Sequence, residues 1–167
     1  MKKIALCTGL MLLCACAPQP RPRISLPATE LQTRRTAAES TARQFVSAFY
    51  SKNQEQLLAL STYPFYMDEG GLLNYPQEWQ ESLSALFALR QTWPFELTRV
   101  RLLIPAEVPA FNMQVWNRLV ELKYHQKVYA LVETQLTTPR GPQPEVVFLI
   151  LDYLPDSEQW RVKGLIS

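Results

Sequence analysis

Cysteine and histidine are scarce in this sequence of 167 residues. All three cysteines lie within the first sixteen residues, and His125 is the single histidine. The rest of the chain therefore has no cysteine pair that could form a disulfide. We also expect no metal site, because a structural zinc ion takes about four ligands, mostly cysteine and histidine. We expect no cofactor either.

Familiar catalytic motifs are missing too. After the first sixteen residues there is no G-x-S-x-G, no P-loop, no H-E-x-x-H and no C-x-x-C. These patterns carry nucleophilic, phosphate-binding, metal-dependent and redox chemistry, respectively. The sequence therefore favours a non-catalytic protein and leaves an enzyme open as the alternative.

Neither sign of charge dominates. The chain has 17 Lys and Arg against 15 Asp and Glu, and loss of Lys2 and Lys3 with an N-terminal signal would leave 15 of each. Binding to nucleic acid needs a strong positive patch for the phosphates, so we expect no nucleic-acid partner. About 130 residues remain after this signal and the proline-rich segment that follows it, enough for one compact domain and too few for two.

The N-terminal apolar run is short. It extends from Ile4 to Leu13, about ten residues, whereas a helix needs about 20 to cross the hydrocarbon core of a bilayer. Because Lys2 and Lys3 precede it, the run is typical of a secretory signal peptide and is set aside from the prediction of the fold.

The residues at the end of this run are Leu13, Cys14, Ala15 and Cys16. They resemble the cleavage site of bacterial lipoproteins, which has a branched apolar residue, two small positions and then a cysteine. The resemblance implies that residues 1–15 are the signal peptide and that Cys16 becomes the lipid-bearing (palmitoylated) N-terminus in a membrane. Ala17 stands where an Asp retains enterobacterial lipoproteins in the inner membrane, which implies the outer membrane and the periplasm.

Two other interpretations of this cysteine pair are weaker. If Cys14 were the anchor, the bulky Leu13 would occupy the cleaved position. If Cys14 and Cys16 held a metal, they would lack the further cysteines or histidines that complete a site. We therefore predict lipidation at Cys16.

A proline-rich segment follows the anchor. Residues 17–35, "APQPRPRISLPATELQTRR", contain four prolines and no apolar periodicity, which predicts an extended tether between a lipidated Cys16 and the domain. Its arginines are Arg21, Arg23, Arg34 and Arg35. They indicate either a solvated spacer, which we favour, or contact with anionic headgroups or an acidic partner.

Three helices are predicted in the first half of the domain, which we place at residues 36–167. The first covers about Thr36 to Ser51, where apolar residues recur at helical spacing: Ala38, Ala42, Phe45 and Phe49. The second begins after Asn53, which suits an N-cap. A turn at residues 68–71 joins two short strands. The third helix starts near Pro76, a residue favoured at the first helical position.

Strands dominate the second half. In "FELTRVRLLI" the apolar alternation slips between Leu97 and Val100, which predicts a bulge. "VYALVETQL" alternates, "EVVFLILDYL" is apolar on both faces and suits a central strand, and "WRVKGLI" sets Trp160, Val162 and Ile166 against charged neighbours. Residues 105–124 fit a short helix or an edge strand equally well. Helices followed by antiparallel strands make an α+β domain.

This order of elements resembles the nuclear-transport-factor-2-like superfamily, a cone-shaped α+β fold. The resemblance rests on "ARQFVSAFYSKNQEQLLAL", "YPFYMDEGGLL", the Trp79 helix and the closing "QWRVKGLIS". It implies two to three N-terminal helices packed on a strongly curved antiparallel sheet over residues 36–167. The proline-bracketed residues 105–124 depart from the pattern.

Enzymes of this superfamily place an acid or histidine in the cone as a general base, with hydroxyl donors beside it. The candidates here are Asp152, which interrupts an apolar strand, with Tyr129 and Tyr153 as donors. His125 between lysines suits an exposed position, and Asp68 with Glu69 suits a turn more than a metal pair.

Two functions remain from the sequence. The favoured one is a non-catalytic binding or assembly module, anchored in the cell envelope by Cys16 and contacting an envelope protein through the exposed sheet face near Trp116, Arg99 and Arg101. The alternative is a protein that binds a small apolar ligand in the cone, or an isomerase-like enzyme that uses Asp152.

Overall fold

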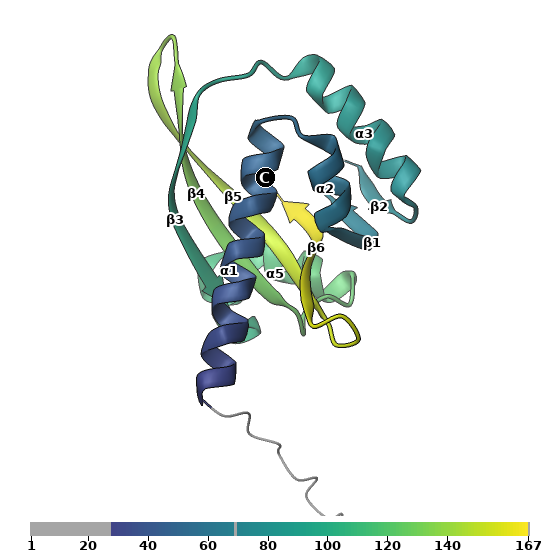
Figure 1. Cartoon of the computed structure of the whole chain (residues 1–167). Coiled ribbons are helices and arrows are strands. Elements are labelled where there is room, and N and C mark those ends of the chain that lie inside the picture. The colour runs from purple at the N-terminus through teal and green to yellow at the C-terminus, as the bar shows by residue number, and fades with distance from the viewer. Residues whose placement is uncertain (1–27, 69, 167) are drawn as a thin grey trace, which may run out of the picture.

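A computed structural model describes residues 28–68 and 70–166 (Figure 1). The predicted signal peptide, the lipidation site at Cys16 and the first part of the tether lie outside these residues. The elements in chain order are α1 (Ala28–Tyr50), α2 (Gln54–Leu60), β1 (Ser61–Met67), β2 (Gly71–Leu73), α3 (Pro76–Leu89), β3 (Phe95–Leu103), the 3₁₀ turn η1 (Pro105–Glu107), α4 (Val108–Phe111), α5 (Met113–Glu121), β4 (Val128–Thr138), β5 (Gly141–Leu154) and β6 (Gln159–Ile166).

The six strands form one curled, unclosed sheet in the order β2-β1-β6-β5-β4-β3. Neighbouring strands are antiparallel, except that β1 pairs with β6 in parallel. Helix α1 crosses one face of the sheet, with α2 and α3 beside it, and α5 lies behind the sheet (Figure 1). The expected α+β architecture is therefore confirmed, with a single parallel pair in an otherwise antiparallel sheet.

Helix α1 begins at Ala28, whereas the sequence pattern placed the start of the first helix near Thr36. Residues 28–35, which we assigned to the tether, are helical. The helix can start this early because no proline follows Pro27 until Pro64. Its first turns are also stabilised by side-chain pairs at spacing i, i+4, such as Arg34 with Glu30 at 2.7 Å. Ala28 directly follows Pro27, so no proline interrupts the helix once it has begun.

The predicted starts of α2 and α3 are confirmed. The Asn53 side chain accepts a hydrogen bond from the Gln56 backbone N–H at 3.0 Å and caps α2. Pro76 is the first residue of α3. Strands β1 and β2 form the predicted antiparallel pair, and Gly71 has a positive φ of 71° that favours glycine.

The slip in β3 is a bulge. Leu97 pairs with Thr134 and Arg99 with Glu133, so Thr98 is an additional residue. The Thr98 hydroxyl donates to the Glu133 carbonyl at 3.0 Å. As a result, the apolar residues before and after the slip all pack on the face that α1 covers: Phe95, Leu97, Val100 and Leu102.

A second bulge, in β6, corrects a predicted face. Ile150 pairs with Gly164 and Leu151 with Val162, so Lys163 has no partner on β5. Because this extra residue reverses the alternation, Leu165 faces α1 and Ile166 packs on the other side. The prediction that Ile166 shares a face with Val162 was wrong for this reason.

Residues 105–124 are mainly helical. Asn112 ends α4 and caps α5, since its side chain accepts from the backbone N–H groups of Gln114 and Val115 at 2.9 and 3.2 Å. Leu119 of α5 is fully buried against the sheet. Of the two structures that the sequence allowed, a helix is therefore correct, and it covers the sheet face opposite α1.

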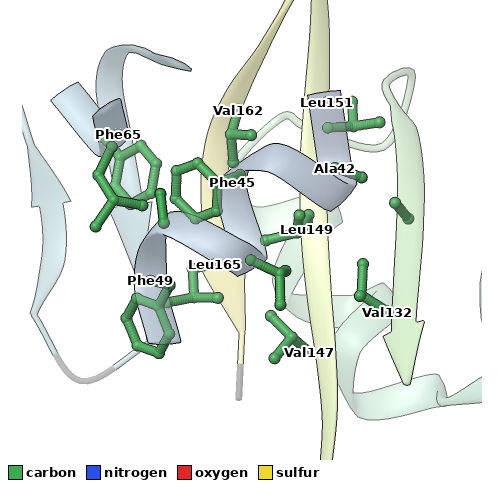
Figure 2. Packing of buried hydrophobic residues seen from close by; sticks show 14 of the residues in the cluster. Ala42, Phe45, Phe49, Phe65, Val132, Val147, Leu149, Leu151, Val162 and Leu165 are labelled. Atoms are coloured by element: carbon green, nitrogen blue, oxygen red, sulfur yellow. The ribbon is translucent and has the colours of Figure 1, made fainter. Parts of the chain in front are cut away.

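Two cores share the sheet. The first lies between α1, α2, α3 and the sheet, where Phe45, Phe49 and Phe65 meet Leu149 and Leu165 (Figure 2). The second lies under α4 and α5 and contains aromatic and aliphatic residues of the opposite face: Tyr66, Leu103, Val108, Leu119, Tyr124, Tyr129, Leu131, Phe148 and Ile150. Strands β4 and β5 contribute to both, because alternate side chains point to opposite faces.

Candidate functional site

A pocket of about 630 Å³ lies between the first turns of α1 and the sheet. We call it the α1 pocket. Its wall contains Leu31, Arg34 and Arg35 of α1, Ile104 after β3, Tyr153 of β5 and Trp160 of β6. Its volume is within the range of pockets that hold small molecules, roughly 300–1,000 Å³.

The apolar wall of the α1 pocket is partly exposed. Leu31 is 61% exposed and Ile104 is 58% exposed, although both are large aliphatic residues. Opposite them, the rings of Tyr153 and Trp160 pack with their centroids 5.2 Å apart. Exposed aliphatic residues that gather at a concave surface indicate a contact site for a ligand or partner.

Two arginines stand at the rim of the α1 pocket. The Arg34 guanidinium lies 4.7 Å from the centre of the Tyr153 ring and pairs with Glu30. Arg35 lies 3.4 Å from Glu39, and its side chain is 59% exposed. Exposed pairs of this kind contribute about 0–1 kcal/mol, so a ligand can replace them at low cost.

The acid in the wall of the α1 pocket is engaged elsewhere. Glu107 accepts a hydrogen bond from the backbone N–H of Ile104 at 2.9 Å. Its other carboxylate oxygen lies 3.8 Å from Arg101. Glu107 therefore stabilises the start of η1 and is poorly placed to act as a general base in the pocket.

The interior of the cone is filled beyond the α1 pocket. Phe65 stacks on Trp79 with ring centroids 4.4 Å apart and on Phe45 at 6.1 Å. The Trp79 indole N–H donates to the Ser61 hydroxyl at 3.1 Å, so its polar atom is satisfied in the core. These large side chains form part of the first core, where Phe45, Phe65 and Trp79 are all fully buried.

Asp152 lies on the other face of the sheet, in a cluster of charges. Its carboxylate accepts from Lys127 at 2.5 Å and lies 3.9 Å from Lys163. Both Asp152 and Lys163 have largely buried side chains, 17% and 11% exposed. Burial lowers the pKa of Lys163, while the nearby Asp152 carboxylate opposes that shift. The carboxylate thus balances a buried ammonium group.

The two predicted hydroxyl donors do not meet Asp152. The Tyr129 hydroxyl donates to the Tyr124 carbonyl at 2.7 Å within the second core, and burial raises the pKa of Tyr129 to about 12. Tyr153 faces the α1 pocket on the opposite side of the sheet. The structure therefore does not bring Asp152, Tyr129 and Tyr153 together at one site.

A polar network closes the end of the cone opposite the α1 pocket. The Tyr50 hydroxyl donates to Glu145, which also pairs with Arg90 at 3.1 Å. The Arg90 guanidinium lies 4.8 Å from the centre of the Tyr50 ring. Burial, followed by the hydrogen bond to Glu145, raises the pKa of Tyr50 to about 12. The network joins the end of α3 to α1 and β5.

A second hollow of about 440 Å³ lies beside α4 and α5, and we call it the outer pocket. Phe111 stacks on Phe148 there, with centroids 6.2 Å apart. Arg118 donates to the Tyr66 hydroxyl at 2.9 Å, and Tyr66 donates to Asp68 at 3.0 Å. Phe111 and Val146 are each 47% exposed. This hollow exists because α4 and α5 cover only part of the sheet face.

The remaining candidates from the sequence, Trp116, His125, Arg99 and Arg101, lie on or near the sheet face opposite α1. Trp116 of α5 is half-buried and packs edge-on against His125, with ring centroids 6.4 Å apart. His125 was expected to be exposed, but its side chain is half-buried. Arg99 and Arg101 are exposed on β3, and their partners Glu133 and Leu131 place them on the face opposite α1.

The α1 pocket was not predicted from the sequence. Its residues come from six elements, and its arginines fall in the segment that we assigned to the tether. A signal for the longer helix was present. Leu31 precedes Ala38 by seven residues, and Glu30 precedes Arg34 by four, which are both helical spacings.

No cluster of three or more His, Cys, Asp or Glu residues that could hold a metal occurs within residues 28–68 and 70–166. In the same part of the chain, no helix is long and apolar enough to span a membrane. Lipidation at Cys16 stays a prediction, because that residue lies outside the described part of the chain.

Solved structures with a similar fold share little sequence with this chain. A structure from Catenulispora acidiphila has a TM-score of 0.52 at 8% identity, covering 82% of this chain and 91% of that chain. Aln2 from a Streptomyces species has a TM-score of 0.49 at 12% identity, covering 85% and 92%. PrhC from Penicillium brasilianum has a TM-score of 0.46 at 19% identity, covering 79% of each chain.

No protein-family model matches the sequence, and no curated protein matches it. At such low identity, the likeness to the Catenulispora acidiphila structure shows the fold and does not extend to a ligand or reaction. The helices on a six-stranded, curled and unclosed sheet agree with the cone-shaped α+β fold that the sequence resembles.

Proposed function

We propose that this chain is a lipid-anchored protein of the cell envelope whose domain binds a ligand without catalysing a reaction. The α1 pocket carries this proposal, because it combines an exposed apolar wall with two arginines and has no free acid or histidine among its lining residues. General acid–base catalysis needs such a group within hydrogen-bond reach of the reacting atom.

The anchor of this protein is Cys16 in our proposal, with the periplasmic side of the outer membrane as its location. The support is the lipoprotein-like "LCAC" sequence after a short apolar run, and Ala17 next to it. Eleven residues separate Cys16 from Ala28, so a fully extended chain places α1 within roughly 40 Å of the anchor. The α1 pocket, at the start of α1, would then lie at the membrane side of the domain.

A protein partner in the envelope is a second part of the proposal. The outer pocket and the neighbouring exposed residues Phe111, Met113 and Val146 form the surface that we assign to it. This replaces Trp116 as the expected contact, since Trp116 is half-buried against His125. Arg99 and Arg101 lie on the same side of the sheet and stay in the proposal.

The isomerase-like alternative has little support. Its base would be Asp152, whose carboxylate is held by Lys127 and Lys163 on the sheet face opposite the α1 pocket. Asp152 lines neither the α1 pocket nor the hollow beside α4 and α5, and the Tyr129 hydroxyl donates to the Tyr124 carbonyl in place of a ligand.

The anchor is tested by Cys16→Ser in the full chain. We expect the unprocessed or soluble periplasmic form in place of the mature membrane-bound one, as seen by fractionation and by the mass of the N-terminus. Cys14→Ser is the matched control and should fractionate as the wild type does. A Cys16→Ser chain that still matures and remains with outer membranes would show that the anchor is wrong.

A further inference from the structure

We infer that the α1 pocket binds an anionic amphiphile with one apolar chain and an acidic headgroup. The inference rests on the ligand-binding role proposed above and names the class of ligand. The headgroup lies at Arg34 and Arg35, and the apolar chain lies along Leu31, Ile104 and Trp160.

The charges in the wall favour an anion. Arg34 and Arg35 are accompanied by one acid in the wall, Glu107, and that acid already accepts a backbone hydrogen bond and lies near Arg101. Among the described residues, their carboxylate partners are Glu30 and Glu39 on the same helix, across partly exposed contacts, and Arg34 also lies over the Tyr153 ring. A carboxylate or phosphate can replace these contacts and accept two parallel hydrogen bonds from one guanidinium.

The rest of the wall favours a hydrocarbon chain. Leu31 and Ile104 are more than half exposed, and Leu102, Val128 and Trp160 continue the apolar surface toward the sheet. Methylene groups placed against this surface are removed from water, which favours their binding. Because the arginines lie on α1 and this apolar surface continues on the strands, the pocket suits a molecule with one polar and one apolar end.

The position of the pocket indicates where such a ligand would come from. The pocket begins at the first turns of α1, and eleven residues lie between Cys16 and the start of this helix. An anchor at Cys16 would therefore keep the pocket close to a membrane, which contains both free fatty acids and acidic lipids. The chemistry shared by these two sources is an anionic headgroup on an acyl chain.

The test is a competition experiment with the full chain carrying Cys16→Ser, which lacks the proposed anchor and keeps every described residue. Fluorescent cis-parinaric acid is the probe, and hexadecanoic acid and hexadecanol compete with it. We expect the acid to displace the probe at a concentration about tenfold or more below that of the alcohol, which corresponds to about 1.4 kcal/mol or more. Competition by lysophosphatidylglycerol, which has an anionic headgroup, is compared in the same way with competition by lysophosphatidylcholine, which has a zwitterionic one.

Variants locate the headgroup. Arg34→Gln with Arg35→Gln should abolish the preference for the acid and leave displacement by the alcohol unchanged. Arg43→Gln is the matched control, since Arg43 is an exposed arginine of α1 that does not line the α1 pocket. Competition by the acid or by lysophosphatidylglycerol that depends on Arg34 and Arg35 supports the inference, and the more potent of the two identifies the source.

Two results would overturn the inference, and they differ in what else they affect. Equal competition by hexadecanoic acid and hexadecanol would show that the ligand needs no anionic headgroup, and the pocket would then be a site for an uncharged apolar ligand. If the probe does not bind at all, or binds equally to a Leu31→Glu, Ile104→Glu chain, the α1 pocket is not the ligand site and the proposed binding function fails with it.

Discussion

At the scale of single residues, the buried charges lie where they hold the sheet together. Asp152 on β5 contacts Lys127, just before β4, and approaches Lys163 at the bulge of β6. Lys163 also lies 5.5 Å from the centre of the Tyr124 ring. The cluster therefore connects three strands at one end of the second core.

Asp152→Asn should destabilise the fold by about 1–3 kcal/mol, because it leaves the largely buried Lys163 ammonium without its carboxylate. Urea unfolding at pH 7 measures the loss. The double variant Asp152→Asn, Lys163→Met should recover part of it, since no unpaired charge is then buried. An Asp152→Asn chain as stable as the wild type would show that the cluster does not stabilise the fold.

Two tyrosines make the fold sensitive to alkaline pH. The pKa of Tyr50 and that of Tyr129 are both raised from 10.0 to about 12 in the folded chain, mainly by burial. An unfolded tyrosine loses its proton near pH 10, so each residue contributes stability that is complete below pH 10 and lost as the pH rises toward 12. Three other tyrosines shift in the same direction, and Lys163 opposes them.

The free energy of unfolding should therefore fall between pH 10 and pH 12, as measured by urea unfolding at several pH values. Tyr129→Phe should reduce the slope, because it removes one of the shifted groups. Tyr75→Phe is the control and should leave the slope unchanged, since Tyr75 is 64% exposed. A slope that is the same in wild type and Tyr129→Phe would contradict the assigned cause.

At the scale of elements, α5 depends on its cap and on a narrow buried face. Asn112 accepts two backbone N–H groups at the start of the helix, and Leu119 is its fully buried residue. A helix of 9 residues has little stability by itself, so its cap and its packing on the sheet decide whether it forms.

Asn112→Ala should cost about 1 kcal/mol and speed amide hydrogen exchange in residues 113–118, because the two backbone donors at the helix start lose their side-chain acceptor. Hydrogen exchange followed by mass spectrometry measures it. Asn53→Ala is the matched control: it should cost a similar amount and affect α2 in place of α5. Unchanged exchange at residues 113–118 would show that the cap is not needed.

At the scale of the whole molecule, β4 and β5 connect two cores. Phe148 faces α4 and α5, whereas the next residue, Leu149, faces α1. Both are almost completely buried. Since the two cores share the backbone hydrogen bonds of the same strands, they should unfold together.

Leu149→Ala should lower stability by about 2–5 kcal/mol and Phe148→Ala by about 3–5 kcal/mol, through the cavities that they leave. Circular dichroism and tryptophan fluorescence during urea unfolding should report one shared transition for each variant. If Phe148→Ala instead produced a separate early transition, α4 and α5 would form an independently unfolding layer.

The helices and strands that could be predicted from the sequence are those marked by a pattern among neighbouring residues. The stripe of Ala38, Ala42, Phe45 and Phe49 indicates a helix without reference to any other residue, and the slip after Leu97 indicates the bulge at Thr98. The second bulge was missed because a glycine follows Lys163, and Gly164 has no side chain to mark the change of face.

The amino-acid order alone thus leads to the α+β class, most of the helices and strands, and the expected anchor at Cys16, because hydrophobic period, caps and signal peptides are properties of neighbouring residues. It does not lead to the α1 pocket, the charge cluster at Asp152 or the face that α5 covers. Those features join residues separated by up to about a hundred and thirty positions, as Leu31 and Trp160 are in the α1 pocket. Such contacts depend on strand order and packing, which no local pattern encodes.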